Sequence, residues 1–132
     1  MLTEIRVNLP DQHVEQRRVD GLEIFGKALA TTRLIEATDP DQTLYLTGYT
    51  PLGASGLGFA GKLNVYGISL LGGNLQGSRS GGLITRYLTR LGIVGIQVVG
   101  DAPAPVILHI DADGQTKIHP LADYGDGFTG TY

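Results

Sequence analysis

Residues 72–82 read GGNLQGSRSGG, and the fold of the middle of the chain depends on how this stretch is interpreted. Five of its eleven residues are glycine, which favours turns and loops over regular elements. Apolar residues with helical spacing follow immediately, from Leu83 to Leu91, and Gly92 is suited to end a helix. We therefore expect a glycine-rich loop that passes into a helix at about Ser80.

The same loop has features that favour the binding of an anion. Glycines let backbone N–H groups approach a ligand closely, and the free N–H groups at a helix N-terminus attract negative charge. Arg79 adds a planar cation suited to phosphate. The alternative is that Gly81 and Gly82 only allow a helix to pack closely on a sheet, and that Arg79 is solvated. The candidate site residues in this loop are Gly73, Ser78, Arg79, Ser80, Gly81 and Gly82.

Outward from this loop, the apolar pattern alternates between strands and helices. Helical spacing predicts a second helix, from Asp20 as its N-cap to about Glu36. We predict an α+β domain in which a mixed β-sheet carries its helices on one face. A second copy of the chain is the simplest cover for the other face. The predicted strands span residues 5–9, 14–19, 43–47, 59–69, 93–99, 106–110 and 115–119, with a loop at 48–58.

Length and composition narrow the class of protein. The chain has 132 residues, which suits one domain, and we place that domain at 1–122 and a glycine-rich tail at 123–132. A net charge of −3 argues against nucleic-acid binding. The chain has no cysteine, so it can form neither disulfides nor cysteine-ligated iron–sulfur clusters, and this fits a cytoplasmic protein. No apolar run approaches the ~18 residues of a membrane span.

The ordered series of motifs resembles the N-terminal, pterin-binding domain of the aldehyde ferredoxin oxidoreductase family. The likeness covers nearly the whole chain, and no single piece of it is specific. It rests on the order and nearly equal spacing of five segments. These segments read IRVNL, FGKALA, TDPDQTLYLTGYTPLGASG, GKLNVYGISLLGG and SRSGGLITRYLTRLGIVGIQVVG.

The resemblance implies that this region contacts a bis-pterin cofactor carrying tungsten or molybdenum. Where the family has an arginine in its long strand, this chain has Lys62, which keeps the charge but loses the planar fork. Where the family has an asparagine before its paired glycines, this chain has Arg79. The glycines themselves match Gly81 and Gly82. The frame of the site is therefore kept, while two cofactor-contacting positions have changed.

In the family that this chain resembles, the first domain consists of two similar halves related by a pseudo-twofold axis. The cofactor lies across both halves. This chain resembles one half, so we expect a homodimer, stacked as a four-layer α/β/β/α sandwich, that rebuilds the whole cradle. In relatives, which oxidise aldehydes with an iron–sulfur protein as acceptor, the cluster cysteines and acid–base residues lie in later domains. The resemblance thus implies no catalytic residue, metal ligand or iron–sulfur cluster in this chain.

We accordingly expect a non-catalytic binding module or carrier for a phosphate-bearing tungstopterin or molybdopterin. One alternative is a small subunit or remnant of a tungsten or molybdenum oxidoreductase that needs an iron–sulfur partner chain. Another is a purely structural dimer. Neither a nucleic acid nor a membrane is an expected partner.

Two further groups of residues have ordinary explanations. His109 and His119 flank a predicted hairpin turn and should be offset along its strands, which favours structural or solvent-facing roles over a metal pair. Arg79, Arg86 and Arg90 have separations that would put them on one stripe of the predicted helix.

Overall fold

The computed structural model describes residues 1–50 and 61–124. The predicted loop at 48–58 and the tail from 125 onward lie mostly outside the described residues, and so does the start of the predicted strand at 59–69. The elements, in chain order, are β1 (Thr3–Asn8), β2 (His13–Arg18), α1 (Gly26–Glu36), η1 (Pro40–Gln42), β3 (Thr43–Thr47), β4 (Leu63–Ile68), β5 (Leu75–Ser80), α3 (Ile84–Leu91), β6 (Ile93–Val99), β7 (Val106–Ile110), β8 (Thr116–Pro120) and η2 (Leu121–Tyr124).

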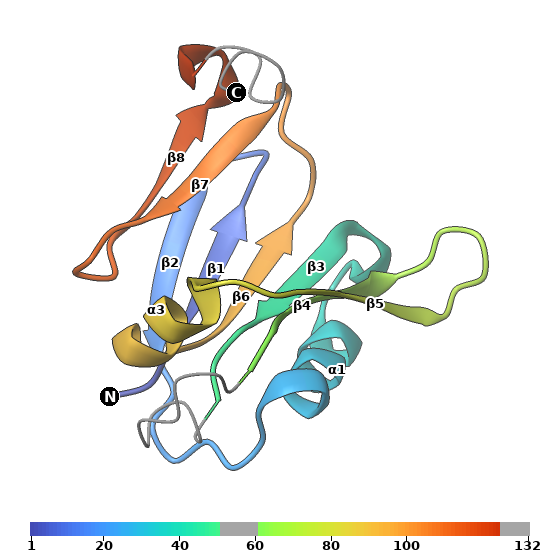
Figure 1. Ribbon diagram of the computed structural model, residues 1–132. Helices are drawn as coiled ribbons and strands as arrows, with labels where there is room; N and C mark the ends of the chain where they lie inside the picture. Colours follow the sequence, from blue (N-terminus) through green and yellow to red (C-terminus); the bar gives the residue numbers. More distant parts are fainter. Residues whose placement is uncertain (51–60, 125–132) are drawn as a thin grey trace.

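Six of the strands form one mixed sheet in the order β2-β1-β6-β3-β4-β5 (Figure 1). β1 and β6 are parallel, and the other neighbouring strands are antiparallel. β7 and β8 form a separate antiparallel hairpin. The prediction of an α+β domain with a mixed sheet is confirmed. The domain boundary at residue 122 stays a prediction.

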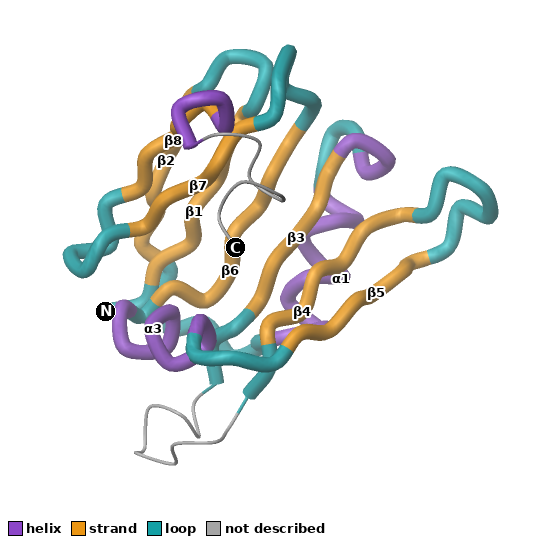
Figure 2. Tube along the Cα trace, turned by 45° about the horizontal axis from the view of Figure 1, so that its top comes forward, coloured by secondary structure: helices purple, strands orange, loops and turns teal. Residues whose placement is uncertain are grey.

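The helices do not share one face of the sheet, and the prediction on this point is wrong. Leu29, Ala30 and Leu34 of α1 are buried against one side, which we call the α1 face. Leu88 of α3 is buried on the opposite side, the α3 face, where the β7–β8 hairpin also packs (Figure 2). The α3 face of β1 and β6 is therefore already covered. The stacked four-layer dimer, which stays a prediction, would have to use β3 to β5.

The helices lie on opposite faces because β6 has apolar residues on both of its sides. Val94 contributes to the α1-face core, while Ile93 and Ile96 contribute to the α3-face core. A register irregularity where β6 meets β1 at Thr3 and Glu4 makes this pattern possible. A central strand that is apolar on both sides needs a cover on both sides, and each helix supplies one.

Helix α1 begins later than the capping pattern predicts. Asp20 does not cap it. Its carboxylate accepts a hydrogen bond from the backbone N–H of Leu2 at 3.2 Å and one from Arg18. These contacts tie the start of the chain to the end of β2, and the chain runs on to Gly26 before it becomes helical. The predicted end near Glu36 is confirmed.

The stretch 72–82 is the largest departure from the sequence-based prediction. Residues Leu75–Ser80 form β5, which pairs along its whole length with β4. The chain turns back between the two strands at residues 69–74, where the Gly73 N–H donates to the Ser69 carbonyl at 2.8 Å. The helix begins only at Ile84. Among the described residues, no helix is long and apolar enough to cross a membrane.

Candidate functional site

The β4–β5 hairpin fixes the position of Arg79. Asn64 pairs with Arg79 and Tyr66 pairs with Gly77, so these four residues lie on one face of the hairpin. This is the α1 face, because Tyr66 is buried in the α1-face core. Gly77 is required there, since a Cβ at this position would come within 2.9 Å of the Tyr66 ring.

A recess of about 280 Å³ lies on this face and is lined by α1, β4 and β5. We call it the β5 recess. It carries two cationic side chains, Lys27 from the first turn of α1 and Arg79 from β5. Neither cation forms an ion pair within residues 1–50 and 61–124. The complete lining is Lys27, Asn64, Tyr66, Leu75, Gly77, Ser78 and Arg79.

Asn64 brings an unused hydrogen-bond acceptor to the recess. Its amide nitrogen donates to the carbonyl oxygen of Lys62 at 3.0 Å. Its Oδ1 atom is buried and accepts no hydrogen bond. A buried acceptor without a donor costs free energy. The recess thus combines two cationic side chains with a polar one, and the described residues provide no ion-pair partner for either cation.

The structure separates the site residues predicted from the sequence into groups. Ser78 and Arg79 line the β5 recess. Ser80 pairs with Leu63, and its hydroxyl donates to the carbonyl of Gly81 at 3.3 Å. Gly73 lies in the hairpin turn at the opposite end of β5 from Ser80, so it is not part of the same site.

The predicted helix N-terminus is also absent from the site. Helix α3 starts at Ile84, and its N-cap residue Leu83 makes no side-chain capping hydrogen bond. Gly81 and Gly82 join β5 to this helix, and Gly82 has a φ of 118°, which only glycine adopts readily. Lys62 is exposed and directly precedes β4. The start of α3 is therefore not part of the recess.

Five residues of the recess were not among the candidates from the sequence: Lys27, Asn64, Tyr66, Leu75 and Gly77. Lys27 stands within the FGKALA segment, but its proximity to Arg79 depends on α1 packing against β3 and β4. Asn64 and Tyr66 could have been placed beside Arg79 only by recognising β4 and β5 as a hairpin. As long as residues 75–80 are taken for a loop, nothing in the sequence indicates that Asn64 and Tyr66 lie on the same face as Arg79.

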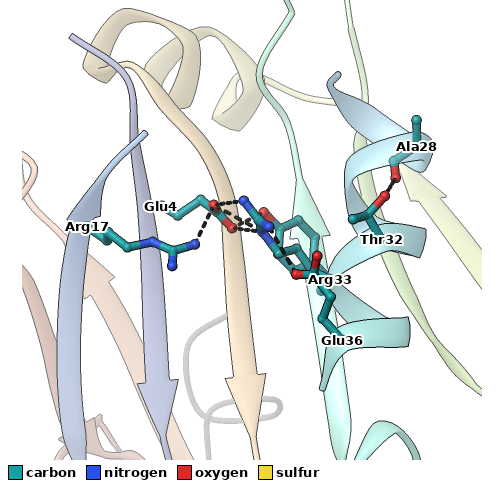
Figure 3. Close-up of polar contacts among 7 residues, drawn as sticks. Glu4, Arg17, Ala28, Thr32, Arg33 and Glu36 are labelled. Atoms are coloured by element: carbon teal, nitrogen blue, oxygen red, sulfur yellow. Dashed lines mark hydrogen bonds and ion pairs between the residues drawn. The ribbon is translucent and has the colours of Figure 1, made fainter. Parts of the chain in front are cut away.

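A second polar cluster anchors α1 to the sheet (Figure 3). Glu4 of β1 is buried and receives hydrogen bonds from Arg33 at 2.7 and 2.9 Å, from Tyr45 at 2.8 Å and from Arg17 at 3.2 Å. Burial alone would raise the pKa of Glu4, but the hydrogen bonds from Arg33 and Tyr45 and the charge of Arg33 outweigh it and lower this pKa. Burial, together with the hydrogen bond to Glu4, raises the pKa of Tyr45. The cluster therefore links α1, β2 and β3 to the buried carboxylate of β1 and has a structural role.

The other basic and histidine residues do not form a second strong site. Arg79 is on β5, so the predicted stripe with Arg86 and Arg90 is wrong; those two arginines line a hollow of about 150 Å³ on α3 with Leu83 and Tyr87. The rings of His109 and His119 are 5.7 Å apart. In the part of the chain that the structure describes, no group of three or more potential metal ligands occurs.

The comparisons with known proteins agree with this architecture. Residues 4–129 match the family model of the aldehyde ferredoxin oxidoreductase N-terminal domain. The chain belongs to this family. Its resemblance to that domain, read from the order of the motifs, is thereby confirmed. The search among curated proteins gave no match.

The fold of this chain is also found in solved structures. One of them is described as the active site complex BamBC of benzoyl coenzyme A reductase in complex with 1,5-dienoyl-CoA. The two structures align with a TM-score of 0.78 at 19% sequence identity, over 92% of this chain. The aligned region is 20% of the other chain, so this family member spans about a fifth of that protein's length.

Proposed function

We propose that this member of the aldehyde ferredoxin oxidoreductase N-terminal domain family is a non-catalytic binding module or carrier for a phosphate-bearing tungstopterin or molybdopterin, and that it acts as a homodimer. The observation that carries the proposal is the β5 recess, which Lys27 and Arg79 both line and where neither has a carboxylate partner among residues 1–50 and 61–124. Two cationic side chains that line one recess favour a doubly charged anion such as a phosphate ester.

The residues of the recess fit the phosphate-bearing end of such a cofactor. Its volume of about 280 Å³ is at the lower limit of small-molecule sites, so it suits part of the cofactor rather than the whole. Arg79 supplies a planar fork for phosphate oxygens, and Lys27 supplies a point charge. The Asn64 side chain, on the same face as Arg79, offers a further polar contact.

When bound, the metal of such a cofactor would supply redox chemistry. The chain's own residues bind and orient: Arg79 and Lys27 neutralise the phosphate, and Asn64 adds a polar contact. Binding without chemistry is the role that this set of residues supports.

A second candidate is a small subunit of a tungsten or molybdenum oxidoreductase that works with a partner chain bearing iron–sulfur clusters. It is favoured by the solved structure with the same fold, which is described as an active site complex, BamBC, of benzoyl coenzyme A reductase. Metal analysis and absorption spectra of the protein from its native host separate the candidates. Tungsten or molybdenum with pterin absorbance supports the binding module, and co-purifying iron supports the subunit. A colourless, metal-free dimer supports a purely structural protein.

Removing either free cation should weaken anion binding. With inorganic pyrophosphate as the probe, Arg79→Ala and Lys27→Ala should each lose ~1–3 kcal/mol of binding free energy, because each removes one charge-assisted contact. Isothermal titration calorimetry measures the change. Arg86→Ala, which removes an exposed arginine from α3, is the matched control and should bind pyrophosphate as the wild type does. Equal affinities for all four proteins would contradict the proposed site.

A further inference from the structure

Strand β5 is an open edge of the sheet. It pairs with β4 on one side, and no described strand pairs with its other side. Residues 76–80 are all exposed, and the hairpin projects from the body of the molecule (Figure 1). An edge strand presents a row of backbone N–H and C=O groups that another strand can bind.

The two edges of the sheet differ in how they are protected. β2, the opposite edge, carries exposed charges at Glu15, Arg17 and Arg18, which disfavour strand addition. β5 has a single charged residue, Arg79, and a glycine at position 77. It contains no proline and no bulge in its pairing with β4. The edge formed by β5 is therefore the one suited to accept a strand.

We propose that β5 pairs antiparallel with β5 of a second copy of this chain, about a twofold axis at Ser78. In this register Ser78 faces Ser78 of the other copy, and Gln76 faces Ser80. Arg79 faces Gly77 of the other copy, which has no side chain, so its guanidinium can lie toward the Tyr66 ring that packs over that glycine. No like charges stand directly opposite each other, and serine pairs can hydrogen-bond across the strands.

The same register accounts for apolar residues that are otherwise left in solvent. Leu70 and Leu71, in the hairpin turn, are 81% and 101% exposed. Counting outward from Ser78, the turn of one copy comes beside the start of α3 in the other. There Leu83 and Ile84 are 59% and 46% exposed. Apolar groups on both copies would then be removed from water at each end of the paired strands.

The pairing also has a consequence for the β5 recess, and this part rests on the proposed function. Because a twofold axis perpendicular to the sheet keeps the α1 faces on the same side, the two recesses become neighbours. Each then has the guanidinium of the other copy's Arg79 beside its own. Pyrophosphate that neutralises these cations would strengthen the dimer. The strand pairing itself does not depend on any ligand.

Engineered cysteines test the register directly, because the chain has no cysteine of its own. In the proposed pairing, the two Cβ atoms at position 78 are about 4.5–5.5 Å apart, close to disulfide distance. Ser78→Cys should form a covalent dimer on mild oxidation without any ligand. Ser80→Cys is the matched control on the same strand, since the two copies are offset there by about 13 Å, and it should stay unlinked.

A mixture of Gln76→Cys and Ser80→Cys chains should give the heterodimer in preference to either homodimer, which is specific to this register. Sedimentation of the wild-type chain should show a dimer, and Ser78→Lys should raise its dissociation constant at least tenfold. The added charge His13→Lys on β2 should leave it unchanged. A wild-type monomer, or a dimer that Ser78→Lys leaves unchanged, would overturn the proposal; the second result would point to the stacked arrangement. A dimer that does not bind pyrophosphate would leave the interface standing and remove only the proposed function.

Discussion

Replacing Gly95 with alanine is expected to destabilise the domain by about 3 kcal/mol or more. Gly95 is buried in β6, and a Cβ there would lie 1.9 Å from the hydroxyl oxygen of Tyr45 and 2.3 Å from its Cζ atom. Tyr45 cannot withdraw easily, because it is fully buried and its hydroxyl donates to Glu4 at 2.8 Å. The new methyl group must displace either the ring or the central strand, and both carry the core.

Urea unfolding followed by circular dichroism measures this loss. Gly81→Ala is the matched control, because Gly81 has no left-handed backbone and nothing within 4 Å of an added Cβ. It should change the free energy of unfolding by no more than about 0.5 kcal/mol. A Gly95→Ala protein as stable as Gly81→Ala would show that the contact with Tyr45 is not close-packed.

Replacing Glu4 with alanine is expected to cost about 3–5 kcal/mol at neutral pH. The substitution leaves the guanidinium of Arg33, whose side chain is only 18% exposed, without the carboxylate to which it donates its two shortest hydrogen bonds. It also leaves the buried hydroxyl of Tyr45 without an acceptor. Since Arg33 belongs to α1, the link between this helix and β1 is lost together with the charge pair.

The contribution of Glu4 should depend on pH with a definite sign. Its pKa is lower in the folded protein than its ordinary value of 4.5, so the folded state binds the proton less readily than the unfolded state. The stabilisation is fully present above pH 4.5 and is lost as the pH falls through the lowered pKa. Glu4→Gln cannot titrate there, so the stability gap between it and the wild type should shrink in acid.

Glu36 provides the control for this cluster, because it binds the same arginine from the surface. Its carboxylate lies 3.1 Å from Arg33 Nη1, but its side chain is 58% exposed. Glu36→Ala should therefore cost no more than about 1 kcal/mol. If it cost as much as Glu4→Ala, the energetic importance of the buried carboxylate would be refuted.

The sequence predicts the buried part of the fold well, because burial leaves a periodic trace. Ile5 and Val7 alternate with polar neighbours and are both 1% exposed in β1. Leu29 and Ala30 have helical spacing and are fully buried in α1. In each case one face of an element rests on the core, and the residues on that face had to be apolar.

The sequence did not predict strand β5, because this strand has no buried face and therefore no alternating apolar pattern. Its residues, LQGSRS, show neither alternation nor an apolar run, and only Leu75 is partly buried. Glycine and serine at such density predict a loop on local grounds. The strand exists because β4 offers a row of backbone partners, and hydrogen bonding to a neighbour needs no particular side chains.

By itself, the sequence determined the α+β class and the family. Each of these depends on local pattern or on the order of motifs along the chain. Only the tertiary structure decided that the helices lie on opposite faces, that residues 75–80 are a strand, and that Lys27 and Asn64 share a recess with Arg79. These features arise from contacts between residues distant in the chain, and local periodicity carries no record of such pairings.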